Sequence, residues 1–148
     1  MAARIERATQ LDREAVEMLI EALHKSEGMT ARRDRISYAV EQQLKQRFGG
    51  LLLVARDKST IVGVALATYQ PSAELGRVLV VQDFYVVPEH RRKGVGRALA
   101  QKILDEAKAL RVDRIDLEIL PKNVVAPAFW KALGFRTEGR TIFSKNLT

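Results

Sequence analysis

The feature that most constrains this 148-residue chain is a strand pattern, a basic glycine turn and a helix pattern in direct succession between residues 78 and 108. The strand pattern is a run of β-branched and aromatic residues from Val78 to Val87, and only Gln82 and Asp83 interrupt it. Pro88 ends the run, because proline has no N–H for a strand ladder. Apolar residues then recur at helical spacing from residue 98 to residue 107. This order predicts a buried strand, a loop and a helix.

The loop between them combines three cations with two glycines, in the segment Arg91-Arg92-Lys93-Gly94-Val95-Gly96. The first turn of a helix presents N–H groups without internal partners and carries about half a positive charge. Glycines let a ligand approach the backbone, so such a junction suits phosphate or pyrophosphate. The alternative is a solvated basic turn. The P-loop spacing is absent, and the Rossmann pattern is excluded because Leu99 stands where its third glycine is needed.

Length and composition predict one domain over residues 1–148, because the chain is long enough for a core and too short for two ordinary domains. No run approaches the ~18 apolar residues of a membrane span, and the first residues lack a signal-peptide core, so we expect a cytoplasmic protein. Without cysteines and with only two histidines, no metal site is expected. The net charge of +7 favours an anionic partner, and no nucleic-acid-binding motif accompanies it.

The remaining patterns, in which strand runs are followed by helix, strand and helix, predict a mixed sheet and not an all-parallel one. A short edge strand comes first, followed by a helix capped by Thr9 or Asp12 and a second helix from Thr30 to about Arg47. Two apolar runs, 51–56 and 61–69, predict an antiparallel hairpin. The predicted elements of the last third are a strand over 114–120, a short helix ending before Gly134, and one or two strands over 135–143.

The glycine loop resembles the acyl-CoA loop of the GCN5-related N-acetyltransferase (GNAT) superfamily. That loop has Arg or Gln, two variable residues, Gly, one variable residue, and then Gly or Ala, which Arg91, Gly94 and Gly96 match. A second segment of the chain resembles the family's carboxyl-terminal signature, with the same residue order and the same intervals between residues. It consists of Leu117-Glu118-Ile119, Asn123, Ala126 and Phe129-Trp130-Lys131-Ala132-Leu133-Gly134-Phe135. The spacing is closest to that of ribosomal-protein amino-terminal acetyltransferases.

The resemblance covers roughly residues 50 to 140 and implies a fold and an activity. The implied fold is α+β, with a mixed central sheet of about six to seven strands that splays between two parallel central strands, and about four flanking helices. The implied activity is transfer of an acetyl group from acetyl-CoA to a primary amine of a small molecule, peptide or protein. The alternative is an acyl-CoA-binding module with little catalysis. The sequence leaves the acceptor, and the choice between monomer and homodimer, open.

The resemblance also implies which residues contact acetyl-CoA. The main chain near Phe84, Tyr85 and Val86 would bind the pantetheine arm, and Val86 N–H would stabilise the oxyanion. The pyrophosphate would lie on the loop, and further contacts would come from the second motif. The loop residues are Arg91, Arg92, Lys93, Gly94, Val95, Gly96 and Arg97; the second-motif residues are Asn123, Phe129 and Trp130. Trp130 stands where most relatives have a tyrosine acid, and indole cannot serve as an acid near neutral pH. Packing against core or cofactor is its other interpretation.

Three residues are candidates for catalysis, because an alkyl ammonium with a pKa near ~10 must lose a proton before attack. Glu118 occupies the position of the general base in the ribosomal-protein branch, and an ordinary surface carboxylate is its alternative. Asp83 is the second candidate base, since a charge within an apolar strand needs a reason; a buried structural role is its alternative. Tyr85 is a candidate proton donor or a core tyrosine.

The resemblance places acceptor selectivity near the loop between the first two helices. The residues concerned are His24, Glu27, Met29, Arg32, Arg33 and Arg35. The three arginines crowd the start of the second predicted helix, where positive charge opposes the helix dipole. They indicate either contact with an anionic substrate or partner, or an ordinary exposed basic patch.

Overall fold

The computed structural model describes residues 3–47 and 49–148. Its packing forms two compact units, the first ending at Glu118 and the second running from Ile119 to Thr148. The strands are β1 (Arg4–Arg7), β2 (Gly50–Asp57), β3 (Thr60–Ser72), β4 (Gly76–Val86) and β5 (Arg114–Leu117). The α-helices are α1 (Arg13–Ser26), α2 (Arg33–Leu44), α3 (Val95–Ala109) and α4 (Ala126–Ala132), and two short 3-10 helices are η1 (Gln10–Asp12) and η2 (Pro88–His90).

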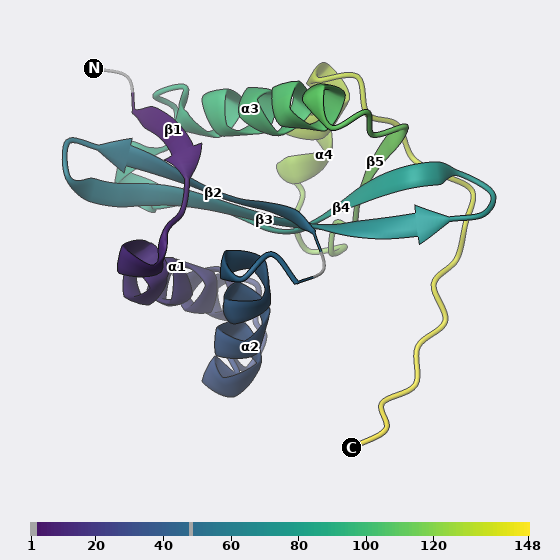
Figure 1. Ribbon diagram of the computed structural model, residues 1–148, viewed down its shortest axis with the longest axis horizontal. Coiled ribbons are helices and arrows are strands. Elements are labelled where there is room, and N and C mark those ends of the chain that lie inside the picture. Colours follow the sequence, from purple (N-terminus) through teal and green to yellow (C-terminus); the bar gives the residue numbers. More distant parts are fainter. Residues whose placement is uncertain (1–2, 48) are drawn as a thin grey trace. The chain divides into compact units, whose positions relative to one another are not determined.

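The first unit contains one mixed sheet with the strand order β1-β2-β3-β4-β5 (Figure 1). The first four strands pair antiparallel, and β4 pairs with β5 in parallel. The predicted mixed sheet, hairpin and parallel pair are therefore confirmed. The predicted number of six to seven strands is too high for the described residues, which form five. We expected the two parallel strands at the centre of the sheet. Because β5 is the last strand of this order, the parallel pair β4–β5 lies at the edge instead.

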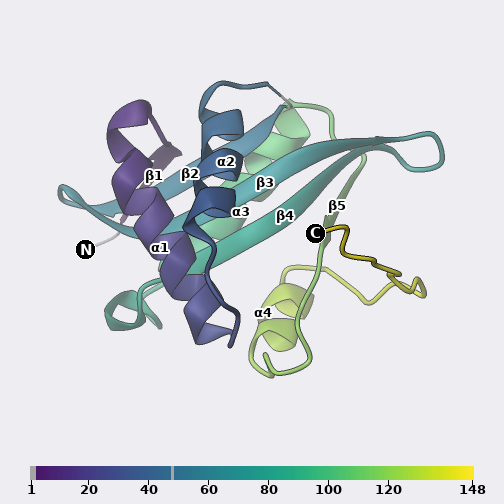
Figure 2. The ribbon, with the colours of Figure 1, turned by 90° about the horizontal axis from the view of Figure 1, so that it is seen from below.

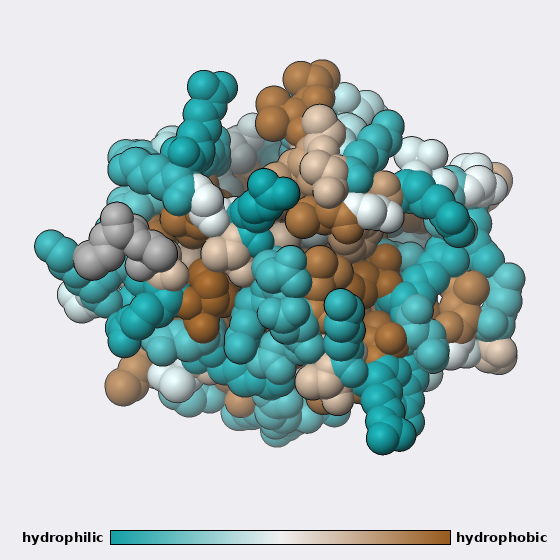
Figure 3. Space-filling view, turned by 90° about the horizontal axis from the view of Figure 1, so that it is seen from above, coloured by the Kyte–Doolittle hydropathy of each residue, from teal (hydrophilic) through white to brown (hydrophobic). Residues whose placement is uncertain are grey.

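Helices cover both faces of this sheet, with α1 and α2 on one face and α3 on the other (Figure 2). Successive side chains of a strand point to opposite faces, so β2 supplies both cores. The core under α1 and α2 contains Val16, Ile20, Ile36, Val40, Leu52, Val54, Val64 and Leu66. The core under α3 contains Leu51, Leu53, Ala65, Ala67, Leu79, Val81, Leu99, Ile103 and Ala107. The space-filling view from the α3 side shows hydrophilic side chains with several apolar groups between them (Figure 3).

A β-bulge in β4 decides which face its polar residues occupy. Leu66 pairs with Asp83 while Ala67 pairs with Val81, so Gln82 is an extra residue in β4. Before the bulge, Leu79 and Val81 pack under α3. After the bulge, Tyr85 packs under α1 and α2. Because the extra residue reverses the alternation, Asp83 and Tyr85 face the α1–α2 layer.

The pairing between β4 and β5 ends well before β4 does. Its register runs from Val78 opposite Arg114 to Val81 opposite Leu117. β4 continues to Val86, so its last five residues extend past the β5 ladder. The sequence predicted a strand to residue 120, but β5 ends at Leu117, where the polar Glu118 becomes exposed.

α1 and α2 are joined by ion pairs that converge on Glu17, a buried carboxylate of α1. Arg13 donates to it at 2.9 Å, and Arg33 and Ser37 of α2 donate at 3.2 and 3.0 Å. Burial by itself would raise the pKa of Glu17, but the hydrogen bonds from Arg13, Ser37 and Arg33 outweigh it and leave this pKa below its ordinary value. The network holds the two helices in register.

The second unit contains α4 and an extended carboxyl-terminal segment. Trp130 is buried, and its ring meets those of Phe129 and Phe135 edge-on, with centroids 5.0 and 5.2 Å apart. The strands predicted over 135–143 are absent among the described residues, which form no strand after Leu117. The segment is polar around Gly139, and its apolar residue Phe143 is 92% exposed, so these residues do not pack on a core as a strand of a sheet would. No helix of the described ranges is long and apolar enough to cross a membrane.

Candidate active site

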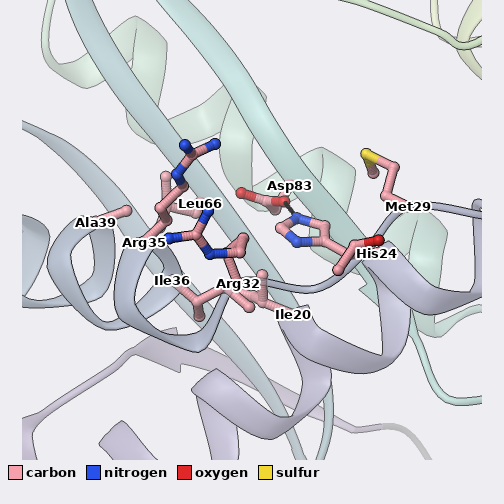
Figure 4. Close-up of a pocket in the computed structure, with 10 residues that line it drawn as sticks. Ile20, His24, Met29, Arg32, Arg35, Ile36, Ala39, Leu66 and Asp83 are labelled. Carbon is pink, nitrogen blue, oxygen red and sulfur yellow. Dashed lines mark hydrogen bonds and ion pairs between the residues drawn. The ribbon is translucent and has the colours of Figure 1, made fainter. Parts of the chain in front are cut away.

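A pocket of about 240 Å³ lies in the first unit, where α1 and α2 meet β3 and β4. Apolar side chains line part of it, and charged side chains line the rest (Figure 4). Its lining consists of Ile20, His24, Met29, Thr30, Arg32, Arg35, Ile36, Ala39, Leu66 and Asp83. The predicted selectivity residues His24, Met29, Arg32 and Arg35 are thus brought together. Glu27 and Arg33, predicted with them, are not part of this lining.

His24 of α1 and Asp83 of β4 form a pair at the pocket wall, with His24 Nε2 and Asp83 Oδ1 2.8 Å apart. Their side chains are 23% and 16% exposed. The bulge at Gln82 turns Asp83 toward the α1–α2 face, so the charged residue of this apolar strand meets His24 as its partner. A carboxylate that holds one imidazole nitrogen orients the ring and leaves its other nitrogen available to exchange a proton. Sequence reasoning did not find this pair, because 59 residues separate its members.

The three arginines at the start of α2 have separate surroundings. Arg33 turns away from the pocket and binds Glu14 and Glu17 of α1. Arg32 donates from Nε and Nη2 to the two carboxylate oxygens of Asp34, at 3.2 and 3.0 Å. The Arg35 side chain lines the pocket, and its guanidinium has no hydrogen-bond or ion-pair partner within residues 3–47 and 49–148. The predicted basic patch is therefore divided by the structure.

Tyr85, a candidate proton donor, is buried in the core under α1 and α2. The Arg91 guanidinium lies 5.3 Å from the centre of its ring. Arg91 also donates from Nε to the Val86 carbonyl at 2.9 Å. Both contacts anchor the start of the basic loop to the end of β4.

The end of β4 exposes main-chain groups on the side away from β3. Val87 N–H donates to Val62 carbonyl of β3 at 2.9 Å. Because antiparallel ladder bonds alternate, the main chain of Val86 points to the opposite edge, where its carbonyl accepts from Arg91 Nε and its N–H is directed away from β3. The β5 ladder does not reach these residues. The Phe84 side chain packs with the core under α3. This edge can therefore bind an extended ligand by main-chain hydrogen bonds.

The basic loop ends in the first turn of α3, as predicted. Gly94 caps the helix with φ +82°, a conformation that suits glycine. Ala98 N–H is bonded to Gly94 carbonyl at 3.0 Å, so the N–H groups of Val95, Gly96 and Arg97 precede the first intrahelical bond. Arg92, Lys93 and Arg97 are exposed. This set of amides and cations matches the donors that a diphosphate requires.

The other predicted site residues lie outside the pocket lining. Glu118 is exposed just after β5 and makes no hydrogen bond or ion pair within the described part of the chain. Asn123 in the second unit accepts the Ala126 N–H at 3.0 Å and so binds the first residue of α4. Phe129 and Trp130 belong to the aromatic cluster of that unit.

Comparison with known protein families shows to which family this chain belongs. The acetyltransferase (GNAT) family profile matches residues 14–135. The chain belongs to this family. The match includes α1, α2 and the pocket, whereas the motifs in the sequence covered only roughly residues 50 to 140.

Curated relatives of this GNAT protein include two enzymes named for their amine acceptors. A thialysine N-epsilon-acetyltransferase of Bos taurus is 32% identical over 50% of this chain and 44% of the relative. A ribosomal protein bS18-alanine N-acetyltransferase of Escherichia coli is 38% identical over 34% of each chain. The matched part is less than half the length of these relatives.

Among solved structures, an aminoglycoside N-acetyltransferase in complex with a CoA-based bisubstrate analogue has a similar fold. Its TM-score is 0.85 at 18% identity, and the similarity covers all of both chains. At this identity the comparison bears on the fold alone, and it confirms the GNAT-like architecture of this protein.

Proposed function

We propose that this GNAT protein transfers an acetyl group from acetyl-CoA to a primary amine bound in the α1–α2 pocket. The observation that carries the proposal is the position of Asp83 on β4, three residues before Val86. Asp83 faces the pocket, while the Val86 N–H lies on the edge of β4 that extends past the β5 ladder. At about 3.3 Å per residue, the two sites lie roughly 10 Å apart along one strand, so the amine nitrogen and the acetyl carbonyl have to meet between them, at about 3–3.5 Å.

The donor set at this edge fits acetyl-CoA. The strand edge offers amide hydrogen bonds to the pantetheine arm, and the first turn of α3 offers three N–H groups and flanking cations to the diphosphate. We assign diphosphate binding to Arg92, Lys93, Gly94, Val95, Gly96 and Arg97, and pantetheine contacts to the main chain of residues 84–86. Acetyl-CoA supplies the acetyl group as an activated thioester. Val86 N–H is our candidate for stabilising negative charge on the acetyl oxygen.

His24 and Asp83 are suited to prepare the amine. When the imidazole proton lies on Nε2 and is donated to Asp83, Nδ1 keeps a lone pair that can accept a proton from the bound ammonium. Removing that proton produces a neutral nucleophile. Glu118, the predicted base, stays a candidate for the same proton, since its exposed position after β5 lets it act through water. The names of the curated relatives, which refer to a side-chain amine and an amino-terminal alanine, support an amine acceptor.

The other parts of the proposal come from the sequence. We propose a single cytoplasmic domain without a metal ion, which acts on a small molecule or peptide amine and not on nucleic acid. Asn123, Phe129 and Trp130 are proposed to border the cofactor. A catalytically weak acyl-CoA-binding module is the second candidate function, because Trp130 replaces the usual tyrosine acid and lies between two aromatic rings.

Calorimetric titration with acetyl-CoA and a thiol-release assay on a panel of amines and peptides test these functions. The enzyme should bind acetyl-CoA and release thiol only when an amine is present. Gly96→Leu should weaken binding at least about tenfold, because its side chain shields the first-turn amides. Ala98→Leu is the matched control, since Ala98 N–H is already bonded to Gly94. Binding without turnover would favour the binding module, and absence of binding would contradict both functions.

A further inference from the structure

The pocket places opposite charges on different walls. Asp83, held by His24, supplies the negative charge from β4. Asp83 is the only carboxylate among the lining residues. Arg32 and Arg35 supply positive charge from the start of α2, on the other side of the pocket in the close-up view (Figure 4). A ligand that satisfies both walls carries a cation at one end and an anion at the other.

Arg35 is the cation whose charge is not balanced. Arg32 is neutralised by Asp34, and the same hydrogen bonds lower the pKa of Asp34 and keep its carboxylate ionised. Arg35 has no such partner in the described ranges and stands in the first turn of α2, where a cation opposes the helix dipole. Its position is therefore unfavourable for the helix alone and becomes favourable when an anion binds there. Guanidinium groups bind carboxylates through two parallel hydrogen bonds.

The apolar wall and the size of the pocket restrict the rest of the ligand. Ile20, Ile36, Ala39 and Leu66 offer a surface for an alkyl segment. The volume of the pocket is about 240 Å³. This space suits a short aliphatic molecule. A second ammonium group would lack a carboxylate among the lining residues, since Asp83 is the only one.

We propose that the acceptor is a short ω-amino acid, with its ammonium group at Asp83 and His24, its alkyl chain on Leu66 and Ile36, and its carboxylate on Arg35. The proposal rests on the proposed acetyltransferase function and names the substrate class of that site. The pocket selects against alkylamines without a carboxylate, which leave Arg35 unpaired, and against diamines, which place a second cation beside it.

Matched amines test the substrate class. We compare kcat/KM for 5-aminopentanoate, pentylamine and 1,5-diaminopentane, which share a five-carbon chain, and repeat the comparison with shorter and longer homologues. The carboxylate should raise kcat/KM on the order of tenfold over the alkylamine, the usual effect of a charge-assisted hydrogen bond, and the diamine should be the poorest substrate.

Variants of Arg35 test the residue. Arg35→Gln should remove the preference for the carboxylate, Arg35→Lys should keep part of it, and Arg35→Glu should reverse it in favour of the diamine. Arg47→Gln is the control, because it removes an equal charge from an exposed residue beyond the end of α2 that does not line the pocket. Melting temperatures of all variants verify the fold, which should persist because the Arg35 guanidinium forms no hydrogen bond or ion pair with the described residues.

The outcomes of these experiments distinguish a failure of the ω-amino acid proposal from a failure of the proposed acetyltransferase function. Acetylation of the three amines with equal kcat/KM, or a preference that survives Arg35→Gln, would overturn the ω-amino acid while leaving the acetyltransferase intact. Acetylation of peptides alone would also overturn it and would leave the reaction class standing. Absence of thiol release with every amine and peptide would overturn both.

Discussion

At the scale of single residues, neighbours in the sequence have different tasks in the structure. Arg32, Arg33 and Arg35 form one basic cluster in the sequence. In the structure Arg33 binds Glu17 of α1 and Arg32 pairs with Asp34, while the Arg35 guanidinium lines the pocket without a partner in the described ranges. Conversely, His24 and Asp83 are far apart in the chain and meet at 2.8 Å. The chemistry of a side chain here depends on which element it faces.

The candidate bases can be separated by single substitutions. His24→Asn keeps a donor for Asp83 but removes the proton acceptor, so kcat should fall about a hundredfold, within the usual range for a lost general base. The affinity for acetyl-CoA, measured by calorimetry, should stay the same because the pocket does not include the α3 turn. Glu118→Gln is the companion variant. If it abolishes turnover while His24→Asn retains it, Glu118 is the base and the pair only binds the amine.

At the scale of elements, local backbone features of β4 and α3 position the site. The extra residue Gln82 turns Asp83 and Tyr85 to the α1–α2 face, while Leu79 and Val81 stay on the α3 face. The early end of β5 leaves the last residues of β4 with an open edge. Gly94 then lets the chain enter α3 in a left-handed conformation. Each feature contributes one part of the site.

Glycine substitutions should reveal how much these turns depend on backbone conformation. A Cβ at Gly94 would meet no atom within 4 Å, so Gly94→Ala should cost only the strain of φ +82°, about 1 kcal/mol. Gly94→Asn should cost less, because asparagine tolerates this conformation and caps helices well. Gly50→Ala adds a clash with the Ala67 carbonyl and should cost roughly 3 kcal/mol or more. Urea unfolding measures all three, and equal costs for Gly94→Ala and Gly50→Ala would contradict this account.

At the scale of the whole molecule, the sheet of the first unit is stabilised by a core on each face, and the α1–α2 layer also depends on ion pairs. Glu17 joins the two helices, and Glu41 of α2 binds Lys45 and Arg13, which lower its pKa to about 2. The pKa of Asp34 is also lowered, by its hydrogen bonds with Arg32. The layer that forms the pocket is thus the one whose carboxylates are most strongly perturbed.

These shifts predict how stability depends on pH. Each lowered pKa means that the folded state favours the ionised carboxylate, so the contribution is present above the unfolded pKa and is lost as pH falls through the folded pKa. For Glu41 that window extends from 4.5 down to about 2. We expect the urea midpoint to fall as pH decreases through this window, and Glu41→Gln to reduce the slope. Parallel curves for the two proteins would contradict the assignment.

Much of the fold followed from sequence patterns. The apolar runs of β2, β3 and β4 and the helical spacing of α1 and α3 predicted these elements, because burial dictates periodicity. The ends were less predictable. The second helix was predicted from Thr30 to about Arg47 and spans Arg33–Leu44, and the strands expected after residue 134 do not form among the described residues. A weakly apolar segment has no periodicity that fixes its partner.

By itself, the sequence determined the strand, the glycine turn and the start of α3, because these depend on neighbouring residues: apolar alternation, proline, glycine and unpaired first-turn amides. It also determined the family, through motifs with fixed spacing. Only the tertiary structure decided that a bulge turns Asp83 toward His24 and that Arg35 completes the pocket with them. The physical reason is that contacts between distant residues depend on strand register and helix packing, which no local pattern encodes.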